Sequence, residues 1–329
     1  MPGSLSCSAR SARSFASGSL VAALSFAAAC SGDSTGHNAY SGGDAGASSG
    51  SRGSSGSSGS GTTSGGSSGA AITSLDGSTH ASPLCDMNGH WLVAQRVLAQ
   101  ALGQTQASHN WFYFEIQQSG EQLLVTKGLH CGFEVKAESA LGANVDSSSV
   151  WPALLTHDTD TGRLGTMKVS GSGCQLAIEK RYTVRGATVP YYDDPATTMP
   201  TASQQATGTT PGWEDWDMDG HPGITLAVTG AASGNLYCAQ RDWNQFTGPV
   251  AARSTSFRVP VQWDAGQDAL GYDPSGSSLV TESAAPATDP SQHYAWFVKL
   301  DASQASGDDT AICAAVRSLV PTLAPDALK

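Results

Sequence analysis

Positive charge is scarce in this sequence. Only 17 of its 329 residues are Lys or Arg, against 28 Asp and Glu, and the formal net charge is −11. Proteins that hold nucleic acid or anionic lipid electrostatically gather basic residues on one surface, because those residues neutralise phosphate charge. The composition therefore argues against nucleic acid as a partner, and equally against an anionic lipid surface as a partner of the folded part.

Signature motifs of common catalytic centres are also missing. The part of the chain expected to fold has no G-x-S-x-G nucleophile turn, and no lysine follows a serine by three residues. An H-E-x-x-H zinc motif and a P-loop are absent as well. No two cysteines have the C-x-x-C spacing of many zinc and redox sites. The sequence alone therefore identifies no catalytic residue.

The sequence also lacks an apolar run long enough to span a bilayer as a helix. Residues 15–29 are apolar but short and diluted by serines, and they follow Arg10 and Arg13. A basic start followed by a short apolar segment is the layout of a secretory signal peptide. We therefore expect residues 1–29 to be a signal peptide and the protein to be exported.

The end of this segment, LSFAAAC over residues 24–30, resembles the lipobox of bacterial lipoproteins, in which the cysteine is lipidated and becomes the first mature residue. Ala29 fits the position before the cysteine, whereas Ala27 replaces the usual leucine and makes A-x-A an ordinary signal-peptidase site. The resemblance implies a lipid anchor at Cys30, and Ser31 after it implies an outer-membrane or cell-surface lipoprotein. A soluble secreted or periplasmic protein is the alternative.

Residues 30–83 are expected to be a disordered tether. Between residues 31 and 70, 14 Ser and 13 Gly fill 27 of 40 positions. Such a composition cannot bury enough apolar surface to fold. About 50 residues of flexible chain have a root-mean-square reach of roughly 40 Å, so the segment sets the distance between an anchor and a domain.

The remainder, residues 84–329, is expected to form a single β-rich domain. Short apolar or alternating runs bounded by turn residues predict an antiparallel sandwich or barrel. The predicted strands are residues 91–98, 111–116, 123–125, 131–135, 176–184, 224–229, 235–240, 257–263 and 294–300. One short C-terminal helix is also predicted, capped by Asp308 or Asp309 and closed by Pro321, with the simplest role of covering an open sheet edge or a barrel mouth.

Five cysteines remain once the signal peptide and the lipidated residue are set aside. An oxidising compartment favours two disulfides and one leftover thiol, which is most simply a buried apolar side chain. Cys131 with Cys174 is the favoured pair, because both begin predicted strands. The disulfide candidates are Cys85, Cys131, Cys174, Cys238 and Cys313.

The most specific chemical signal is a run of alternating aspartates, Asp215, Asp217 and Asp219, followed by Gly220. Calcium takes six to eight oxygen ligands, so carboxylates two residues apart can converge on one ion while glycine permits the sharp turn. With Asp215 as position one, His221 at position seven would offer its backbone carbonyl. These four residues, the three aspartates and His221, are the candidate ligands of a Ca²⁺ ion.

Two departures separate this loop from known calcium loops. An EF-hand requires a bidentate Glu at position twelve, where this chain has Leu226. The loop resembles FG-GAP and VCBS-type calcium loops locally, since it precedes a strand, but Gly223 stands where their last aspartate would be. The motif occurs once, so the repeated fold of those proteins is not implied. A metal-free polar turn is the alternative.

Two functions stay open. The first is a tethered, non-catalytic module that binds a surface ligand or carbohydrate, or has a structural role. The second is a tethered polysaccharide hydrolase that uses carboxylates near Glu214–Asp219 beside Trp213 and Trp216. The Asp158-x-Asp160 turn could be a second weak metal turn, although an ordinary hydrophilic loop is the simpler interpretation. The six histidines of the folded part show no ligand spacing, which favours structural or exposed roles.

Overall fold

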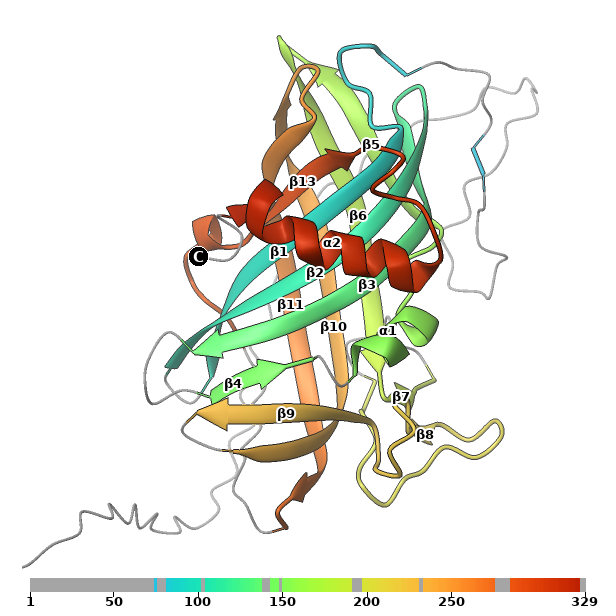
Figure 1. Ribbon diagram of the computed structural model, residues 1–329, viewed down its shortest axis with the longest axis vertical. Helices are drawn as coiled ribbons and strands as arrows, with labels where there is room; N and C mark the ends of the chain where they lie inside the picture. The colour runs from blue at the N-terminus through green and yellow to red at the C-terminus, as the bar shows by residue number, and fades with distance from the viewer. Residues whose placement is uncertain are drawn as a thin grey trace, which may run out of the picture. The chain divides into compact units, whose positions relative to one another are not determined.

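Antiparallel strands make up most of the folded chain, as the alternating runs predict (Figure 1). The computed structural model describes residues 74–75, 81–101, 104–137, 143–147, 150–190, 197–230, 233–275 and 285–325. These residues all belong to one unit, Gly66–Lys329. The expected signal peptide, Cys30 and most of the tether lie outside the described residues.

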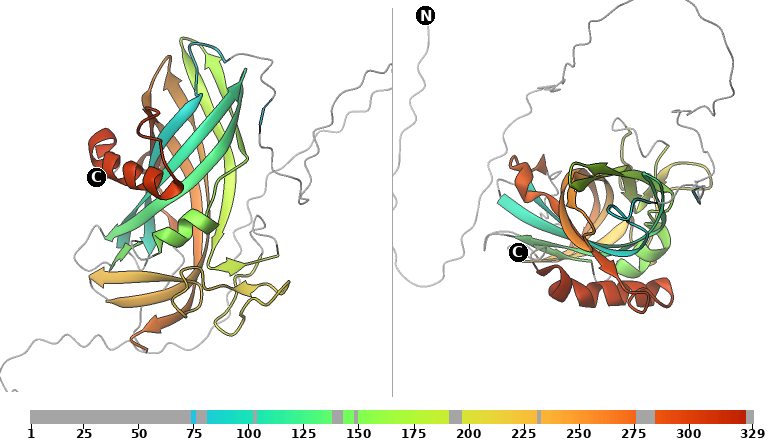
Figure 2. Two further views of the ribbon diagram at one scale, coloured as in Figure 1. Left: turned by 45° about the vertical axis from the view of Figure 1, so that its right-hand side comes forward. Right: turned by 90° about the horizontal axis from the view of Figure 1, so that it is seen from above.

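Eight strands pair edge to edge in a closed antiparallel ring, in the order β11-β13-β1-β2-β3-β5-β6-β10 and back to β11. The strands close around a common interior (Figure 2). Of the two architectures expected, the ring is a barrel. The strands are β1 Gly89–Ala101, β2 Gln104–Ser119, β3 Gln122–Ala137, β5 Arg163–Ser170, β6 Gly173–Arg185, β10 Gly234–Ala251, β11 Ser256–Asp273 and β13 Tyr294–Leu300.

The predicted strands 111–116 and 123–125 lie in β2 and β3, which form an antiparallel hairpin. Ser119 pairs with Gln122 across a two-residue turn. Gly120 has a φ of 60°, a left-handed conformation that glycine adopts without a steric penalty and that matches the twist of two-residue hairpin turns. The register shifts between Trp111 and Phe112, where a bulge bends the hairpin along the curve of the ring.

Apolar side chains fill much of the ring interior. Trp91, Phe114, Phe246 and Phe297 are fully buried there and make three edge-to-face contacts with ring centroids 5.5–6.4 Å apart. Each fully buried aromatic side chain contributes about 1.5–3 kcal/mol of stabilisation from apolar burial. This cluster is the main hydrophobic core.

The wall of the ring forks between β3 and β10. Residues 122–125 of β3 pair with β5, while residues 134–135 pair with β4 (Ala143–Asp146). Strand β4 then pairs with β9 (Ile224–Gly230), which returns to the start of β10. Helix α1 (Trp151–His157) packs at this fork, where Leu154 joins Phe133 and Trp216 in a second core. The fork separates the main ring from a smaller β4–β9 layer.

Helix α2 (Asp309–Leu323) confirms the predicted C-terminal helix, with the Asp308 carboxylate accepting a hydrogen bond from the Ala311 N–H. Two details of the prediction are wrong. Pro321 lies inside the last turn, where only a terminal hydrogen bond is lost. The helix also covers the outer face of β1, β2 and β3 and not an edge or mouth (Figure 1), because Ile312 and Val316 pack on the apolar residues that face outward there.

The cysteines form two disulfides, Cys85–Cys174 and Cys131–Cys313, and leave Cys238 as a buried free thiol. The predicted count is therefore confirmed, but the favoured Cys131–Cys174 pair is wrong. Cys174 faces the ring interior, whereas Cys131 faces outward beneath α2. Two cysteines on opposite faces of a sheet cannot be bridged, and a shared position at a strand start does not reveal the face.

The remaining elements are short. β7 (Ala187–Thr188) and β8 (Gly212–Trp213) form a two-stranded sheet, β12 (Ala285–Pro286) pairs with β1, and residues Pro290–Gln292 form a 3₁₀ turn. Within the described part of the chain, neither α-helix has the length and apolar character needed to cross a membrane. The two disulfides are compatible with an exported protein.

Candidate metal centre

The predicted metal loop lies between β8 and β9 and is closed by its own backbone. The Trp216 N–H donates to the Gly223 carbonyl at 3.1 Å, and residues 217–222 lie within that closure. Gly223 has a φ of 87°, and a Cβ at this position would overlap the Cys238 carbonyl group. Glycine is therefore required at this position, where the calcium loops that the sequence resembles locally carry an aspartate.

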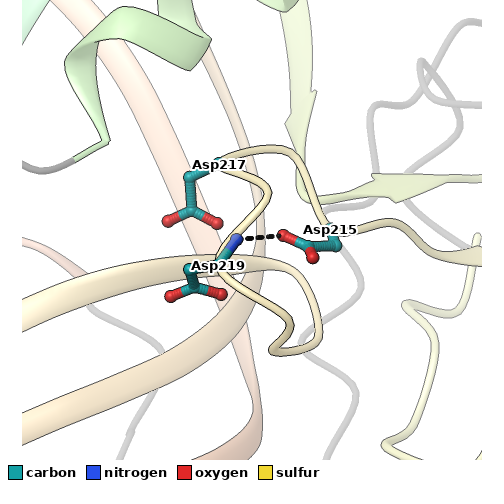
Figure 3. Close-up of side chains that lie close together, drawn as sticks. All are labelled: Asp215, Asp217 and Asp219. Atoms are coloured by element: carbon teal, nitrogen blue, oxygen red, sulfur yellow. Dashed lines mark hydrogen bonds between the residues drawn. The ribbon is translucent and has the colours of Figure 1, made fainter.

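Three carboxylates converge at this loop. Asp215, Asp217 and Asp219 each offer one oxygen, and these oxygens lie within 4.8 Å of one another. Asp215 accepts a hydrogen bond from the Asp219 N–H at 3.2 Å (Figure 3). It also accepts one from the Gly220 N–H at 2.9 Å, and the two bonds hold the loop in its turn. Carboxylates at this separation repel one another unless a cation lies between them, so the cluster could hold a metal ion.

Asp217 is the most constrained of the three. Its Oδ2 accepts the Thr225 N–H at 2.9 Å, while its Oδ1 is buried and has no hydrogen-bond partner among the described residues. Burial raises the pKa of the Asp217 carboxyl, and repulsion from Asp219 and Asp215 raises it further. The hydrogen bond from the Thr225 N–H lowers this pKa but does not outweigh the other two effects. A buried carboxylate oxygen without a partner costs free energy, and a cation would offset that cost.

Asp219 ties the loop to the strand that follows it. Its Oδ1 accepts the His221 N–H at 2.9 Å, and its Oδ2 accepts the hydroxyl of the buried Thr225 at 2.5 Å. Thr225 thus bonds to two of the three aspartates from the start of β9. Ordering of the loop and ordering of β9 are therefore linked.

His221 points its side chain away from a ligand role. Its imidazole stacks on Tyr237 with ring centroids 3.9 Å apart, and Nε2 lies 3.2 Å from the Tyr237 hydroxyl. The sequence assigns only the backbone carbonyl of His221 to a metal, and that assignment stays a prediction. The described metal-capable cluster contains the three aspartates alone.

The other residues proposed for a hydrolytic cleft have structural partners. Glu214 accepts the Thr188 hydroxyl at 2.7 Å through Oε1 and the Trp216 indole N–H at 3.2 Å through Oε2. Trp213 donates its indole N–H to the Ala202 carbonyl at 3.0 Å. These contacts hold in place the backbone segment that leads into the metal loop.

A buried network of charges lies at the fork of the ring, and the sequence did not reveal it. Asp158 accepts hydrogen bonds from His130 Nδ1 and from Arg185 Nε, both at 2.7 Å. Arg185 also bonds to Asp242 at 2.5 Å. Burial alone would raise the pKa of Asp158, but attraction to Arg185 and His130 outweighs it and holds that pKa well below its usual range.

The Asp158–Asp160 turn is therefore neither a metal turn nor an ordinary hydrophilic loop. Asp160 pairs with Arg163 at 2.9 Å and with Arg181 at 3.2 Å, and the Arg163 guanidinium lies over the Phe246 ring. Both aspartates neutralise arginines that enter the fork. The three arginines within residues 163–185 are the sequence feature that could have indicated it.

A cavity of about 260 Å³ opens beside this network, between the end of α1, β6 and β7. Its polar wall includes His157, Thr159, Arg181, Tyr182 and Thr183. His157 stacks on Trp216 with ring centroids 4.6 Å apart, so one wall of the cavity touches the residue that closes the metal loop. None of these cavity residues stood out in the sequence as a binding residue.

Comparison of the chain with protein-family models, with curated proteins and with solved structures found no match.

Proposed function

We propose that the Asp215–Asp219 loop binds Ca²⁺ and that the ion has a structural role in an exported, lipid-anchored, non-catalytic β-rich domain that binds a surface ligand. The observation that carries the metal assignment is the convergence of three carboxylate oxygens within 4.8 Å, one of them on the half-buried Asp217, whose buried Oδ1 has no hydrogen-bond partner among the described residues. Hard oxygen donors on a glycine-bearing loop suit Ca²⁺.

A structural role fits the way the loop is attached. Thr225 joins Asp217 and Asp219 to the start of strand β9, and Gly223 of the Trp216–Gly223 closure packs against the Cys238 carbonyl of β10. Neutralising the carboxylates would therefore order the junction at which β9 and β10 begin their pairing. No observation places a reacting group beside the cluster, so we propose no reaction for it.

Calcium should raise the melting temperature of the mature protein. With only three acidic ligands, and Gly223 and Leu226 at positions nine and twelve, we expect a Kd on the order of 10⁻⁵ to 10⁻³ M, as in extracellular modules. At a Kd of ~10⁻⁵ M, millimolar calcium stabilises by about 2.7 kcal/mol, or roughly 5–10 °C for a domain of this size. Calorimetry in calcium and in chelator measures the shift.

Asp217→Asn should remove that shift, because the amide keeps the shape of the side chain but loses its charge. Asp264→Asn is the matched control, since Asp264 is exposed and bonds only to the adjacent Ala265 N–H. Titration calorimetry should give one ion per chain in the wild type. A melting temperature that ignores both calcium and chelator would reduce the loop to a polar turn.

The proposed anchor is lipidated Cys30, supported by the lipobox-like sequence and by the Ser/Gly-rich segment after it. Cys30→Ala should shift the protein from the membrane fraction to the soluble fraction, because a diacylated cysteine is what would retain it. Fractionation followed by mass analysis of the mature N-terminus checks both points. Unchanged membrane association of the alanine variant would contradict lipid anchoring at Cys30.

The alternative, a tethered polysaccharide hydrolase that uses carboxylates near Glu214–Asp219, gains no specific support. Both Glu214 oxygens already accept hydrogen bonds, and Asp158 is the one carboxylate among the described residues that line the cavity. A glycosidase uses two carboxyls that flank the scissile bond. We therefore develop the binding function and not the hydrolytic one.

A further inference from the structure

The cavity beside α1 lies along an open edge of strand β6. The pairing of β5 with β6 ends at Ile178, whereas β10 continues to pair with β6 as far as Arg185. Among the described strands, residues 181–184 therefore have a neighbour at one edge only, and all four line the cavity. Because consecutive strand residues point to opposite faces, a cavity that touches all four lies at the edge of the strand. Residues 157–159, at the end of α1, form another part of its wall.

Backbone groups on this edge are unpaired. In an antiparallel strand, successive residues direct their N–H and C=O groups to opposite edges, so two of the four residues 181–184 direct theirs away from β10. The described residues give these groups no hydrogen-bond partner. A free strand edge offers a donor and an acceptor side by side, which matches the C=O and N–H of a secondary amide.

One carboxylate oxygen is also left for a ligand. Asp158 is 7% exposed and lines the cavity, and its Oδ2 accepts the hydrogen bonds from both His130 and Arg185. Its Oδ1 has no hydrogen-bond partner among the described residues. A carboxylate oxygen accepts from hydroxyl groups, and an enclosed oxygen without a partner favours a ligand that supplies one.

The other polar groups of the wall suit a ligand that is hydroxylated and neutral. The described structure gives no hydrogen bond to the side-chain hydroxyls of Thr159 and Thr183 or to the His157 imidazole. The two charged side chains of the wall are already matched, since Arg181 pairs with Asp160 and the Asp158 charge is neutralised by Arg185. The cavity therefore offers hydrogen bonds without an unmatched charge.

Size and shape favour a single sugar unit over a peptide. At about 260 Å³ the cavity is slightly smaller than the usual range of about 300–1,000 Å³ for small-molecule sites. Arg181 Nη2 donates to the Thr159 carbonyl at 2.7 Å and so joins β6 to the turn after α1. This bond lies at the first of the four β6 residues, where an added peptide strand would have to pass. Ala187 and Val189 supply apolar contact elsewhere in the wall.

We propose that this cavity binds one N-acetylated hexosamine unit of a surface polysaccharide. The acetamido group pairs with the open edge of β6, and its methyl group contacts Ala187 and Val189. The ring hydroxyls bond to the Thr183 hydroxyl and to Asp158 Oδ1. This assignment rests on the binding role proposed above and names its ligand, and it does not depend on the metal loop.

The test compares N-acetylglucosamine with glucose, which has a hydroxyl in place of the acetamido group, by titration calorimetry on the mature protein. N-acetylglucosamine should bind saturably, and glucose should bind at least about tenfold more weakly, because it cannot pair with the strand edge. In the ¹⁵N-labelled protein, N-acetylglucosamine should shift the backbone amide signals of residues 181–184. Equal binding of the two sugars, no saturable binding, or amide shifts confined to other parts of the chain would each overturn the proposal.

Thr183→Val tests the assigned hydroxyl. It should weaken N-acetylglucosamine binding by about three- to tenfold and leave the melting temperature unchanged, because this hydroxyl has no partner within the described structure. Thr247→Val, an exposed threonine on β10, is the matched control and should bind like the wild type. Wild-type affinity in Thr183→Val would contradict the assigned contact.

A peptide probe separates the two sources of a secondary amide. N-acetylalanine methylamide carries two such amides and no hydroxyl, so it should bind at least about tenfold more weakly than N-acetylglucosamine. Equal or tighter binding of this probe would overturn the sugar assignment in favour of a peptide. The calcium-dependent melting shift is a separate readout, so this proposal and the proposed metal role can fail independently.

Discussion

Gly223 explains why this loop departs from the calcium loops that it resembles. Its left-handed backbone and its contact with the Cys238 carbonyl leave no room for any side chain, so an aspartate at position nine is sterically excluded. In the proposed calcium site, Asp215, Asp217 and Asp219 would therefore be the acidic ligands, with backbone and water oxygens completing the set. The aspartates could be predicted from the sequence, but the steric reason for the glycine required the packing of β10 beneath it.

Asp158 provides the clearest test of a single buried charge. Because Arg185 and His130 both bond to it, Asp158→Asn leaves the Arg185 guanidinium buried with Asp242 as its one carboxylate. We expect a loss of about 3–5 kcal/mol in the free energy of unfolding at pH 7. Chemical denaturation measures it, with Asp268→Asn, an exposed position on β11, expected to stay within about 0.5 kcal/mol of wild type.

The same variant has a defined pH dependence. The pKa of Asp158 is lowered in the folded state, so its contribution is complete above the unfolded value of about 3.9 and is lost as pH falls below it. The stability difference between wild type and Asp158→Asn should therefore be constant from pH 7 to about pH 5 and shrink toward pH 3. A difference that grows on acidification would contradict the charge network.

At the scale of elements, the strands could be predicted because their alternation records which face is buried. The runs at residues 91–98, 257–263 and 294–300 all lie within ring strands β1, β11 and β13. Strand lengths could not be predicted, since β10 and β11 each continue for 18 residues through polar stretches that pair within the ring. Hydrogen-bonded pairing with neighbouring strands of the ring, and not local hydropathy, extends these two strands.

Helix α1 shows why the cavity escaped prediction. It has seven residues, a proline in its first turn and no side-chain cap at Val150, so it carries none of the usual start signals beyond the proline. Its position is fixed by Leu154 in the second core and by the bonding of Asp158 just after it. The walls of the cavity come from α1, β6 and β7, which only the fold brings together.

At the scale of the whole domain, the metal loop and the cavity beside α1 both lie at the fork. Trp216 closes the metal loop and stacks on His157 of the cavity wall, and Glu214 reaches from the same segment to Thr188 on another wall. The metal loop and the cavity are thus both in contact with one short segment, residues 214–216, on the side where the ring divides. The ring interior is filled by apolar side chains, and the metal loop lies outside it, at the fork.

The Cys131–Cys313 disulfide joins β3 to α2 across 182 residues and should dominate the stability of the C-terminal helix. Closing a loop of that length restricts the unfolded chain, so the double variant Cys131→Ala/Cys313→Ala should lose about 2–5 kcal/mol. Replacing both cysteines avoids an added free thiol. The helix should then be cleaved first in limited proteolysis, because only apolar contacts such as those of Ile312 and Val316 still hold it to β1–β3.

The matched control is Cys238→Ala, which removes the buried thiol without opening a bridge and should cost far less. Thiol titration of the denatured, unreduced mature protein should find one thiol in the wild type, one in the Cys131→Ala/Cys313→Ala variant and none in Cys238→Ala. Five thiols in the wild type would remove the disulfide framework. If α2 in the double variant resisted protease as it does in the wild type, packing of the helix against the sheet, and not the covalent bridge to β3, would be what holds it in place.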